Sequence, residues 1–92
     1  MSVLIIDVGT SSIRVARAAP DGSLSGERRV PALPITPVPG LVEFDAEELG
    51  RSALRLATES IEADGAPDGV AITNQRASTV VWDPSTGRPV AP

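Results

Sequence analysis

The chain has 92 residues, of which 41% are apolar and 22% charged, and its formal net charge is −4. This length fits one small domain or part of a larger one, and the composition is typical of a globular chain. The acidic balance disfavours binding to nucleic acids. The absence of cysteine and histidine excludes disulfides, thiolate metal sites and histidine catalysis within these residues.

No apolar run in the chain approaches the length of a membrane-spanning helix. The N-terminal run Val3–Ile6 is also too short for a signal peptide, and Asp7 interrupts it. We therefore expect a cytoplasmic protein that binds neither membranes nor nucleic acids.

The first thirty residues are predicted to form three consecutive strands. Val3–Ile6 is a continuous apolar run, which is typical of a strand buried on both faces. Residues 13–19 show the alternation of a second strand, and the turn at residues 20–22 separates it from a weaker third strand at residues 24–30. The pattern predicts a β-meander.

A proline-rich loop and a helix are expected next. The four prolines within residues 31–40 predict an extended surface loop. Asp45 is a good N-cap for a helix over residues 45–64, with Glu48 in the capping-box position and Gly65 at the end. The residues expected to face the core are Leu49, Ala53, Leu56, Ala57 and Ile61.

Two further strands are predicted after the helix, at residues 70–73 and 78–82. Residues 83–87 are predicted to form a hairpin turn, and Trp82 is expected to pack in the core or against the sheet. The order β-β-β-α-β-β indicates the α/β class but does not close a complete domain.

Residues 7–12 carry the groups that a nucleotide-phosphate site needs. Asp7 ends a buried strand, where a carboxylate can hold Mg²⁺, and Gly9 lets backbone N–H groups approach a phosphate. Because the pattern is short, an ordinary hairpin is the alternative on spacing alone. The candidate nucleotide ligands are Asp7, Gly9, Thr10, Ser11, Ser12 and Arg14.

A second polar group, Asn74-Gln75-Arg76, follows the strand predicted at residues 70–73. Ligands of open α/β sheets bind outside the carboxyl ends of strands. Two amides and a guanidinium at this place can donate hydrogen bonds to sugar hydroxyls, while a solvated polar loop is the alternative.

Three segments, in this order and spacing, resemble a known family. Residues 7–14 (DVGTSSIR) resemble the first phosphate-binding loop of the ATPase superfamily that contains actin, heat-shock chaperones and sugar kinases. Residues 39–45 (PGLVEFD) are similar to the P-G-W-x-E-x-D segment of glycerol kinases. Residues 72–89 are similar to their I-T-N-Q-R…W-D…T-G-x-P segment. The resemblance covers essentially the whole chain and points to the FGGY carbohydrate kinase family.

This resemblance implies a partial ribonuclease H-like (actin-like ATPase) domain, in which residues 1–92 are the incomplete N-terminal part of kinase domain I. It implies ATP-dependent phosphorylation of a sugar or polyol hydroxyl by the longer protein. The six candidate ligands would hold ATP, with Mg²⁺ at Asp7, and Gln75 and Arg76 would contact the substrate. The catalytic aspartate is expected downstream, so we expect the chain alone to be inactive.

The chain departs from glycerol kinases at Ala77, where they have a glutamate that contacts the polyol, and at Leu41, where they have a tryptophan. The loss of a hydroxyl acceptor at Ala77 argues against glycerol as the substrate. Two other functions are open: an actin-like or chaperone-like ATPase, and a non-catalytic binding module. In the second case an unfinished sheet edge would favour homo-oligomers.

Overall fold

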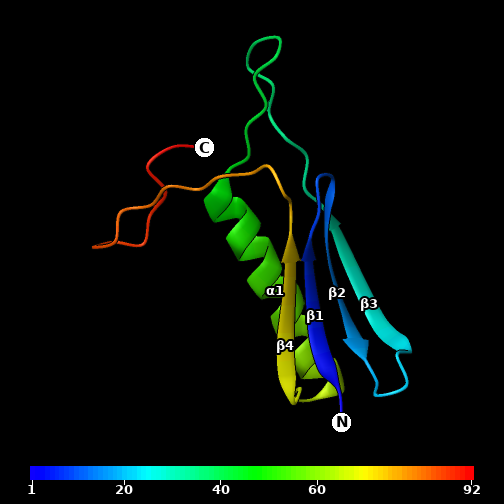
Figure 1. Cartoon of the computed structure of the whole chain (residues 1–92). Coiled ribbons are helices and arrows are strands. Elements are labelled where there is room, and N and C mark those ends of the chain that lie inside the picture. Colours follow the sequence, from blue (N-terminus) through cyan, green and yellow to red (C-terminus); the bar gives the residue numbers. More distant parts are fainter.

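In the computed structural model, which describes all 92 residues, four strands form one mixed sheet and a single helix covers one face of it (Figure 1). This confirms the α/β class. The spatial order of the strands is β3-β2-β1-β4. In chain order the elements are β1 (Val3–Val8), β2 (Ser12–Ala18), β3 (Leu24–Pro31), α1 (Ala46–Asp64) and β4 (Gly69–Asn74).

The first three strands form the predicted antiparallel meander, and β4 then pairs with β1 in parallel. A parallel neighbour needs a crossover connection, which α1 provides. The parallel register runs from Val3 opposite Gly69 to Val8 opposite Asn74. The carboxyl ends of β1 and β4 therefore lie side by side at one edge of the sheet, which is the upper edge in Figure 1.

Local signals at its two ends define α1. The Asp45 side chain accepts a hydrogen bond from the Glu48 backbone N–H at 3.1 Å, as the N-cap prediction requires. At the other end Gly65 adopts a φ of 85° and donates its N–H to the Ile61 carbonyl at 2.9 Å. This helix is not long and apolar enough to cross a membrane.

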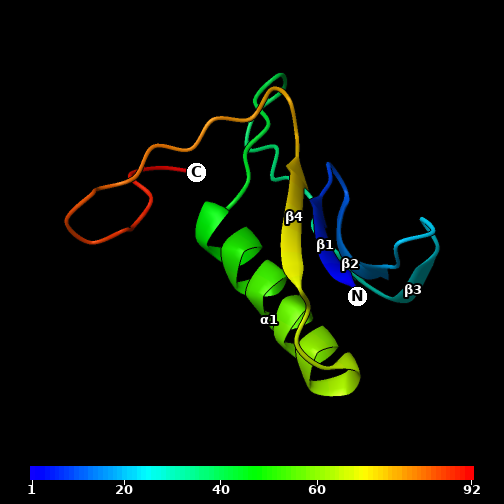
Figure 2. The same ribbon diagram turned by 60° about the horizontal axis from the view of Figure 1, so that its bottom comes forward.

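The core is small and lies between α1 and the first two strands. Its five buried members are Leu4, Ile13, Val15, Leu56 and Ala57. The helix packs on β1, β2 and β3 but makes no contact with β4, and Figure 2 shows it as a layer on one side of the sheet only.

The prediction that Val3–Ile6 is buried on both faces is wrong, because no second layer covers the other face of the sheet. Of these residues only Leu4, which points toward the helix, is buried. Val70 and Ile72 share the register of Leu4 and Ile6 but are 56% and 68% exposed, since α1 does not reach β4.

A buried cation fixes the last turn of α1. The Arg17 guanidinium, 4% exposed, donates to the Ser60 hydroxyl at 3.1 Å, to the Ser2 hydroxyl at 3.1 Å, and to the carbonyl oxygens of Ser60 and Gly65. These contacts explain a wrong prediction: Ser60 is fully buried, whereas Ile61, expected in the core, is 41% exposed. The guanidinium needs oxygen acceptors beneath the helix, and Ser60 supplies two.

The strand predicted at residues 78–82 is absent. This part of the chain leaves the sheet as an extended arm (Figure 1), and no strand lies beside it to complete a ladder. The turn predicted at residues 83–87 is confirmed by a bond from the Gly87 N–H to the Asp83 carbonyl at 2.7 Å. Trp82 sits before this turn and is 59% exposed, so the prediction that it packs in the core or on the sheet is wrong.

The proline-rich loop projects from the body as a narrow finger, residues 32–44 (Figure 1). Two backbone hydrogen bonds join Ile35 and Glu43 across it, at 2.7 and 2.9 Å. The finger ends at Phe44, directly before the helix N-cap, so it connects β3 to the start of α1.

We expect Arg17→Met to lower the free energy of unfolding by about 2–3 kcal/mol. The substitution keeps the apolar stem but leaves buried carbonyl groups without a donor. Urea denaturation followed by far-UV circular dichroism measures the change. The control is Arg51→Met, which removes exposed ion pairs to Glu47 and Glu48 and should cost at most about 0.5 kcal/mol. Equal effects of the two substitutions would contradict the role assigned to Arg17.

Candidate functional site

A charged group lies on the open face of the sheet, close to the ends of β1 and β4. The Asp7 carboxylate accepts a hydrogen bond from the Arg14 guanidinium at 2.8 Å and another from the Thr73 hydroxyl at 2.8 Å. Both partners lie directly opposite Asp7 in the sheet, Arg14 on β2 and Thr73 on β4. The pairing of three strands therefore builds this group.

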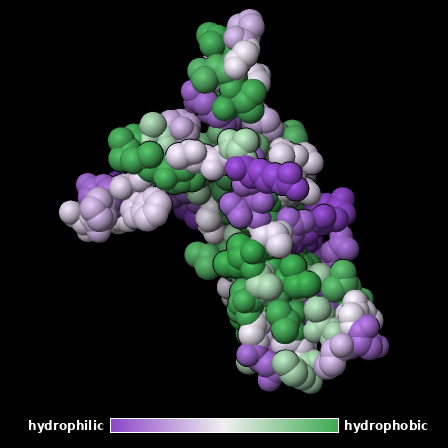
Figure 3. Space-filling view, in the orientation of Figure 1, coloured by the Kyte–Doolittle hydropathy of each residue, from purple (hydrophilic) through white to green (hydrophobic).

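These two hydrogen bonds stabilise the charged form of Asp7. The Arg14 guanidinium, and next the Thr73 hydroxyl, hold the pKa of the Asp7 carboxyl below its ordinary value of 3.8. Because its pKa is lowered, the Asp7 carboxyl is ionised at neutral pH, and its side chain, 33% exposed, is accessible from solvent. Figure 3 shows a hydrophilic area across the upper part of this face, above a largely hydrophobic lower part.

The loop between β1 and β2, residues 9–11, has donors that face no acceptor in the protein. The Gly9 N–H is used, since it donates to the Ser12 carbonyl at 2.9 Å. The backbone N–H groups of Thr10 and Ser11 make no hydrogen bond, and both residues are exposed. Adjacent free N–H groups at a turn are suited to bind an anion such as a phosphate.

Glycine is needed in this loop because of a close backbone approach. A Cβ atom at Gly9 would lie 3.0 Å from the Ser12 carbonyl oxygen, a backbone atom that cannot move without opening the turn. The φ angle of Gly9 is not in the left-handed region. The sequence analysis assigned Gly9 to the close approach of a phosphate, which stays a prediction, and the structure adds a steric reason for glycine within the turn itself.

The polar segment after β4 touches this loop through one side chain. The Gln75 amide donates from Nε2 to the Gly9 carbonyl at 2.9 Å and accepts at Oε1 from the Ser78 hydroxyl at 2.6 Å. The two groups of polar residues singled out in the sequence, residues 7–12 and 74–76, thus meet at one edge of the sheet.

An open cavity of about 670 Å³ lies between this edge, the finger and the start of α1. Thr10 borders it on the loop side, and Phe44 and Leu49 form its apolar wall. Asn74, Gln75 and Arg76 also line it, whereas Asp7, Ser11 and Arg14 do not. The edge therefore has two compartments: a charged one on the open face of the sheet and a mostly apolar one on the side of the helix.

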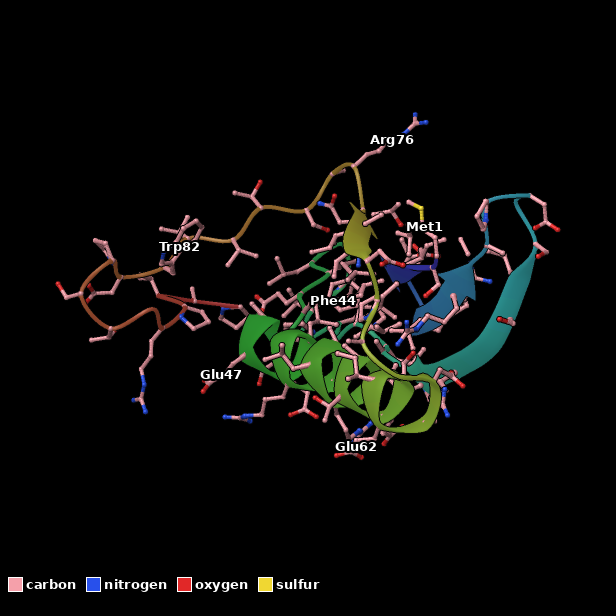
Figure 4. The ribbon with its side chains drawn as sticks, turned by 90° about the horizontal axis from the view of Figure 1, so that it is seen from below. Met1, Phe44, Glu47, Glu62, Arg76 and Trp82 are labelled. Atoms are coloured by element: carbon pink, nitrogen blue, oxygen red, sulfur yellow. The ribbon has the colours of Figure 1, made fainter.

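Arg76 is the cation of this edge with no partner in the chain. Its guanidinium makes no hydrogen bond and no ion pair, and Figure 4 shows it extending away from the helix and from Phe44. Trp82 lies on the arm at a distance from Arg76 in the same view, so the two do not form one surface.

Comparison with known proteins assigns the chain to a family. Residues 2–92 match the N-terminal domain of the FGGY family of carbohydrate kinases. This chain belongs to the FGGY family. A glycerol kinase of Trichlorobacter lovleyi is 44% identical over 92 residues, which is 96% of this chain and 18% of that relative. The chain thus spans less than a fifth of the length of the relatives that it matches.

Solved structures of kinases share the fold of this FGGY chain. The glycerol kinase of Plasmodium falciparum with ADP superposes with a TM-score of 0.86 at 26% identity, over 97% of this chain and 19% of that one. The ligand-bound xylulose kinase of Lactobacillus acidophilus superposes with a TM-score of 0.85 at 14% identity, over 98% of this chain and 18% of that one. These matches confirm the expected actin-like ATPase fold.

The residues present in this FGGY chain fit a nucleotide with its metal ion. The free N–H groups of Thr10 and Ser11 are donors for phosphate oxygens, and Asp7, three residues before Thr10 in the chain, is an ionised carboxylate. No cluster of three acidic side chains exists that could hold a metal ion by itself. Mg²⁺ is commonly held by one or two carboxylates together with the phosphates of the substrate, so a single Asp7 is compatible with it.

Sequence reasoning missed two members of the site. Thr73 was read only as part of a strand, and Ser78 as part of another strand, yet they hold Asp7 and Gln75. The signal for Thr73 lay in the parallel pairing: counting back from the ends of β1 and β4 places it opposite Asp7. No comparable signal existed for Ser78, because its position depends on the path of the arm.

We expect the Asp7 carboxyl to titrate below pH 3.8, since both of its hydrogen bonds favour the charged form. Stability from these bonds is present above the unfolded pKa and is lost as the pH falls through the lowered folded pKa. Carbon-detected NMR of the side-chain carboxyl measures the midpoint. Arg14→Met should raise it more than Thr73→Val does, because the Arg14 hydrogen bond is the larger cause of the shift. The reverse order would contradict this assignment.

Proposed function

We propose that the protein containing this chain transfers a phosphoryl group from ATP to a hydroxyl group of a sugar or polyol. The observation that carries the proposal is the parallel register of β1 and β4, which places a loop with free N–H groups beside the polar segment 74–76. Membership of the FGGY family of carbohydrate kinases supports it.

In this proposal the β1–β2 loop holds the nucleotide phosphates. The N–H groups of Thr10 and Ser11 donate to phosphate oxygens, and the hydroxyl of Ser12 lies next to them in sequence. Arg14 neutralises phosphate charge with the N–H groups that Asp7 does not use. Asp7 is the residue that would hold Mg²⁺, which supplies charge neutralisation when bound.

The cavity side of the edge is proposed to hold the acceptor. Gln75 and Arg76 line the cavity. The Arg76 guanidinium extends away from Phe44 and has no partner in the chain, so in this proposal it turns toward the acceptor and donates to hydroxyl oxygens. A site that donates hydrogen bonds to specific hydroxyls discriminates strongly against substrates that lack them. Ala77 beside Arg76 offers no acceptor, which favours a sugar, another polyol or a sugar acid over glycerol.

Phosphoryl transfer depends mainly on positioning and on stabilising charge, and these parts come from several segments. The present chain contributes the phosphate loop and one wall of the acceptor site. We propose that the residue accepting the hydroxyl proton lies outside residues 1–92, and that this chain alone does not catalyse the reaction.

The proposal is tested with the protein at its native length against a panel of sugars, polyols and sugar acids, with ADP release coupled to NADH oxidation. Nucleotide binding is measured in parallel by calorimetry with ADP and Mg²⁺. We expect phosphorylation of at least one acceptor and binding of the nucleotide. Failure on every acceptor, together with no nucleotide binding, would refute the proposal.

We expect Arg76→Ala to raise the KM for the acceptor about tenfold or more while the KM for ATP changes little. The loss of one charge-assisted hydrogen bond to the acceptor accounts for this size. The matched control is Arg88→Ala on the arm, outside the cavity lining, which should leave both constants unchanged. An unchanged acceptor KM in Arg76→Ala would remove Arg76 from the acceptor site.

Ala77→Glu tests which acceptor the cavity prefers. We expect the new carboxylate to accept hydrogen bonds from polyol hydroxyls and to raise kcat/KM for glycerol about tenfold relative to the wild type. Steady-state kinetics with glycerol and with the best acceptor of the panel gives the comparison. An unchanged kcat/KM for glycerol would show that the residue after Arg76 does not face the acceptor.

A further inference from the structure

We propose that Gln75 is a positioning residue, which locks the phosphate loop to the acceptor segment so that nucleotide and acceptor are aligned together. This inference rests on the proposed function, because it concerns how the two halves of that site are held. It assigns to Gln75 an action through Gly9, in addition to any contact with the acceptor.

The contacts of Gln75 differ from those of its neighbours. It is the partly buried residue of the Asn74-Gln75-Arg76 segment, whereas the other two are exposed. Its amide is used at both ends: Nε2 donates to the Gly9 carbonyl at 2.9 Å, and Oε1 accepts from Ser78 at 2.6 Å. Ser78 thereby orients the amide so that its NH₂ group faces the loop.

The position of Gly9 explains why this contact matters. Its N–H is bound to the Ser12 carbonyl inside the turn, and its C=O is bound to Gln75. With both backbone groups of Gly9 fixed, the next two N–H groups, those of Thr10 and Ser11, are presented to solvent without a partner. The Gly9 carbonyl and the Thr10 N–H belong to one planar peptide group. Gln75 therefore determines the orientation of the peptide that carries the first of the proposed phosphate donors.

No other side chain of residues 74–80 bonds to the loop. The remaining side-chain link between β1 and β4 near this edge runs from Thr73 to Asp7. It lies two residues before the Gln75–Gly9 contact in each segment, on the open face of the sheet. The Ser11 carbonyl of the loop also accepts from the Ala32 N–H at 2.9 Å, which holds the loop to the end of β3 but not to the acceptor segment. The hydrogen bond from Gln75 to the Gly9 carbonyl is therefore the side-chain contact that joins the loop to residues 74–80.

The experiment uses the protein at its native length and the variants Gln75→Met, Gln75→Glu and Ser78→Ala. Met has the length of Gln without its hydrogen bonds, while Glu keeps the acceptor for Ser78 and loses the donor for Gly9. Calorimetry measures the Kd for ADP and Mg²⁺, and kinetics measures the acceptor KM. ¹⁵N relaxation of the ligand-free protein gives the order parameters of residues 9–11.

We expect Gln75→Met and Gln75→Glu to weaken nucleotide binding about three- to tenfold and to raise the acceptor KM by a similar factor, which is the size of one lost hydrogen bond. Ser78→Ala should produce the same pattern with smaller changes. Order parameters of residues 9–11 should fall in all three variants. Arg76→Ala is the control, since a residue that only contacts the acceptor changes the acceptor KM alone.

Two results would overturn the inference: unchanged order parameters in Gln75→Met, or a change in the acceptor KM with an unchanged Kd for the nucleotide. Both are distinct from failure of the proposed function, in which the wild type binds no nucleotide. In that event the order parameters still decide whether Gln75 fixes the loop. A urea denaturation midpoint equal to the wild-type value shows that each variant is folded.

Discussion

The parallel pairing of β1 with β4 is the constraint on which the site depends. Two hydrogen bonds hold it at the start of the strands. The Ser2 N–H donates to the Asp68 carboxylate at 2.8 Å, and the Asp68 N–H donates to the Ser2 carbonyl at 2.9 Å. Near the other end, the Asp7–Thr73 and Gln75–Gly9 contacts continue it. A slip of one residue would turn Thr73 to the helix face and separate it from Asp7. Register, and not any single ligand, therefore creates the site.

The helix makes this register possible and also decides which face is free. α1 crosses from β3 to β4 on one side of the sheet, and Arg17 fixes its last turn to β2 through oxygen atoms of Ser60 and Gly65. The positive charge of the guanidinium also interacts favourably with the carbonyl groups at the C-terminal end of the helix. The last turn of α1 has no basic residue of its own. With the helix on one side, Asp7 and Arg14 remain accessible on the other.

The sequence predicted what local chemistry determines. The N-cap at Asp45, the end at Gly65 and the three-strand meander were all correct, because each depends on neighbours in the chain. The error at Ile61 arose because a distant Arg17 overrides helical periodicity and draws Ser60 into the buried position. The charged character of Asp7 and the turn at Gly9 could be predicted, but Thr73 and Ser78 required the tertiary arrangement. The prediction of a strand at residues 78–82 was wrong, because the strand propensity of a segment does not provide the neighbouring strand with which it must pair.

The finger shows how a wall of the cavity keeps its shape with little packing. Pro34, Val42 and Phe44 reach the cavity from a segment joined across its middle by only two backbone hydrogen bonds. Its three prolines fix φ in the unfolded chain as well as in the folded one, so less backbone entropy is lost when the finger orders. Each well-placed proline stabilises the folded chain by roughly 0.4–1 kcal/mol, which is comparable to the net contribution of one hydrogen bond to stability. The wall is thus stabilised partly by the limited freedom of the denatured state, a contribution that no list of native contacts contains.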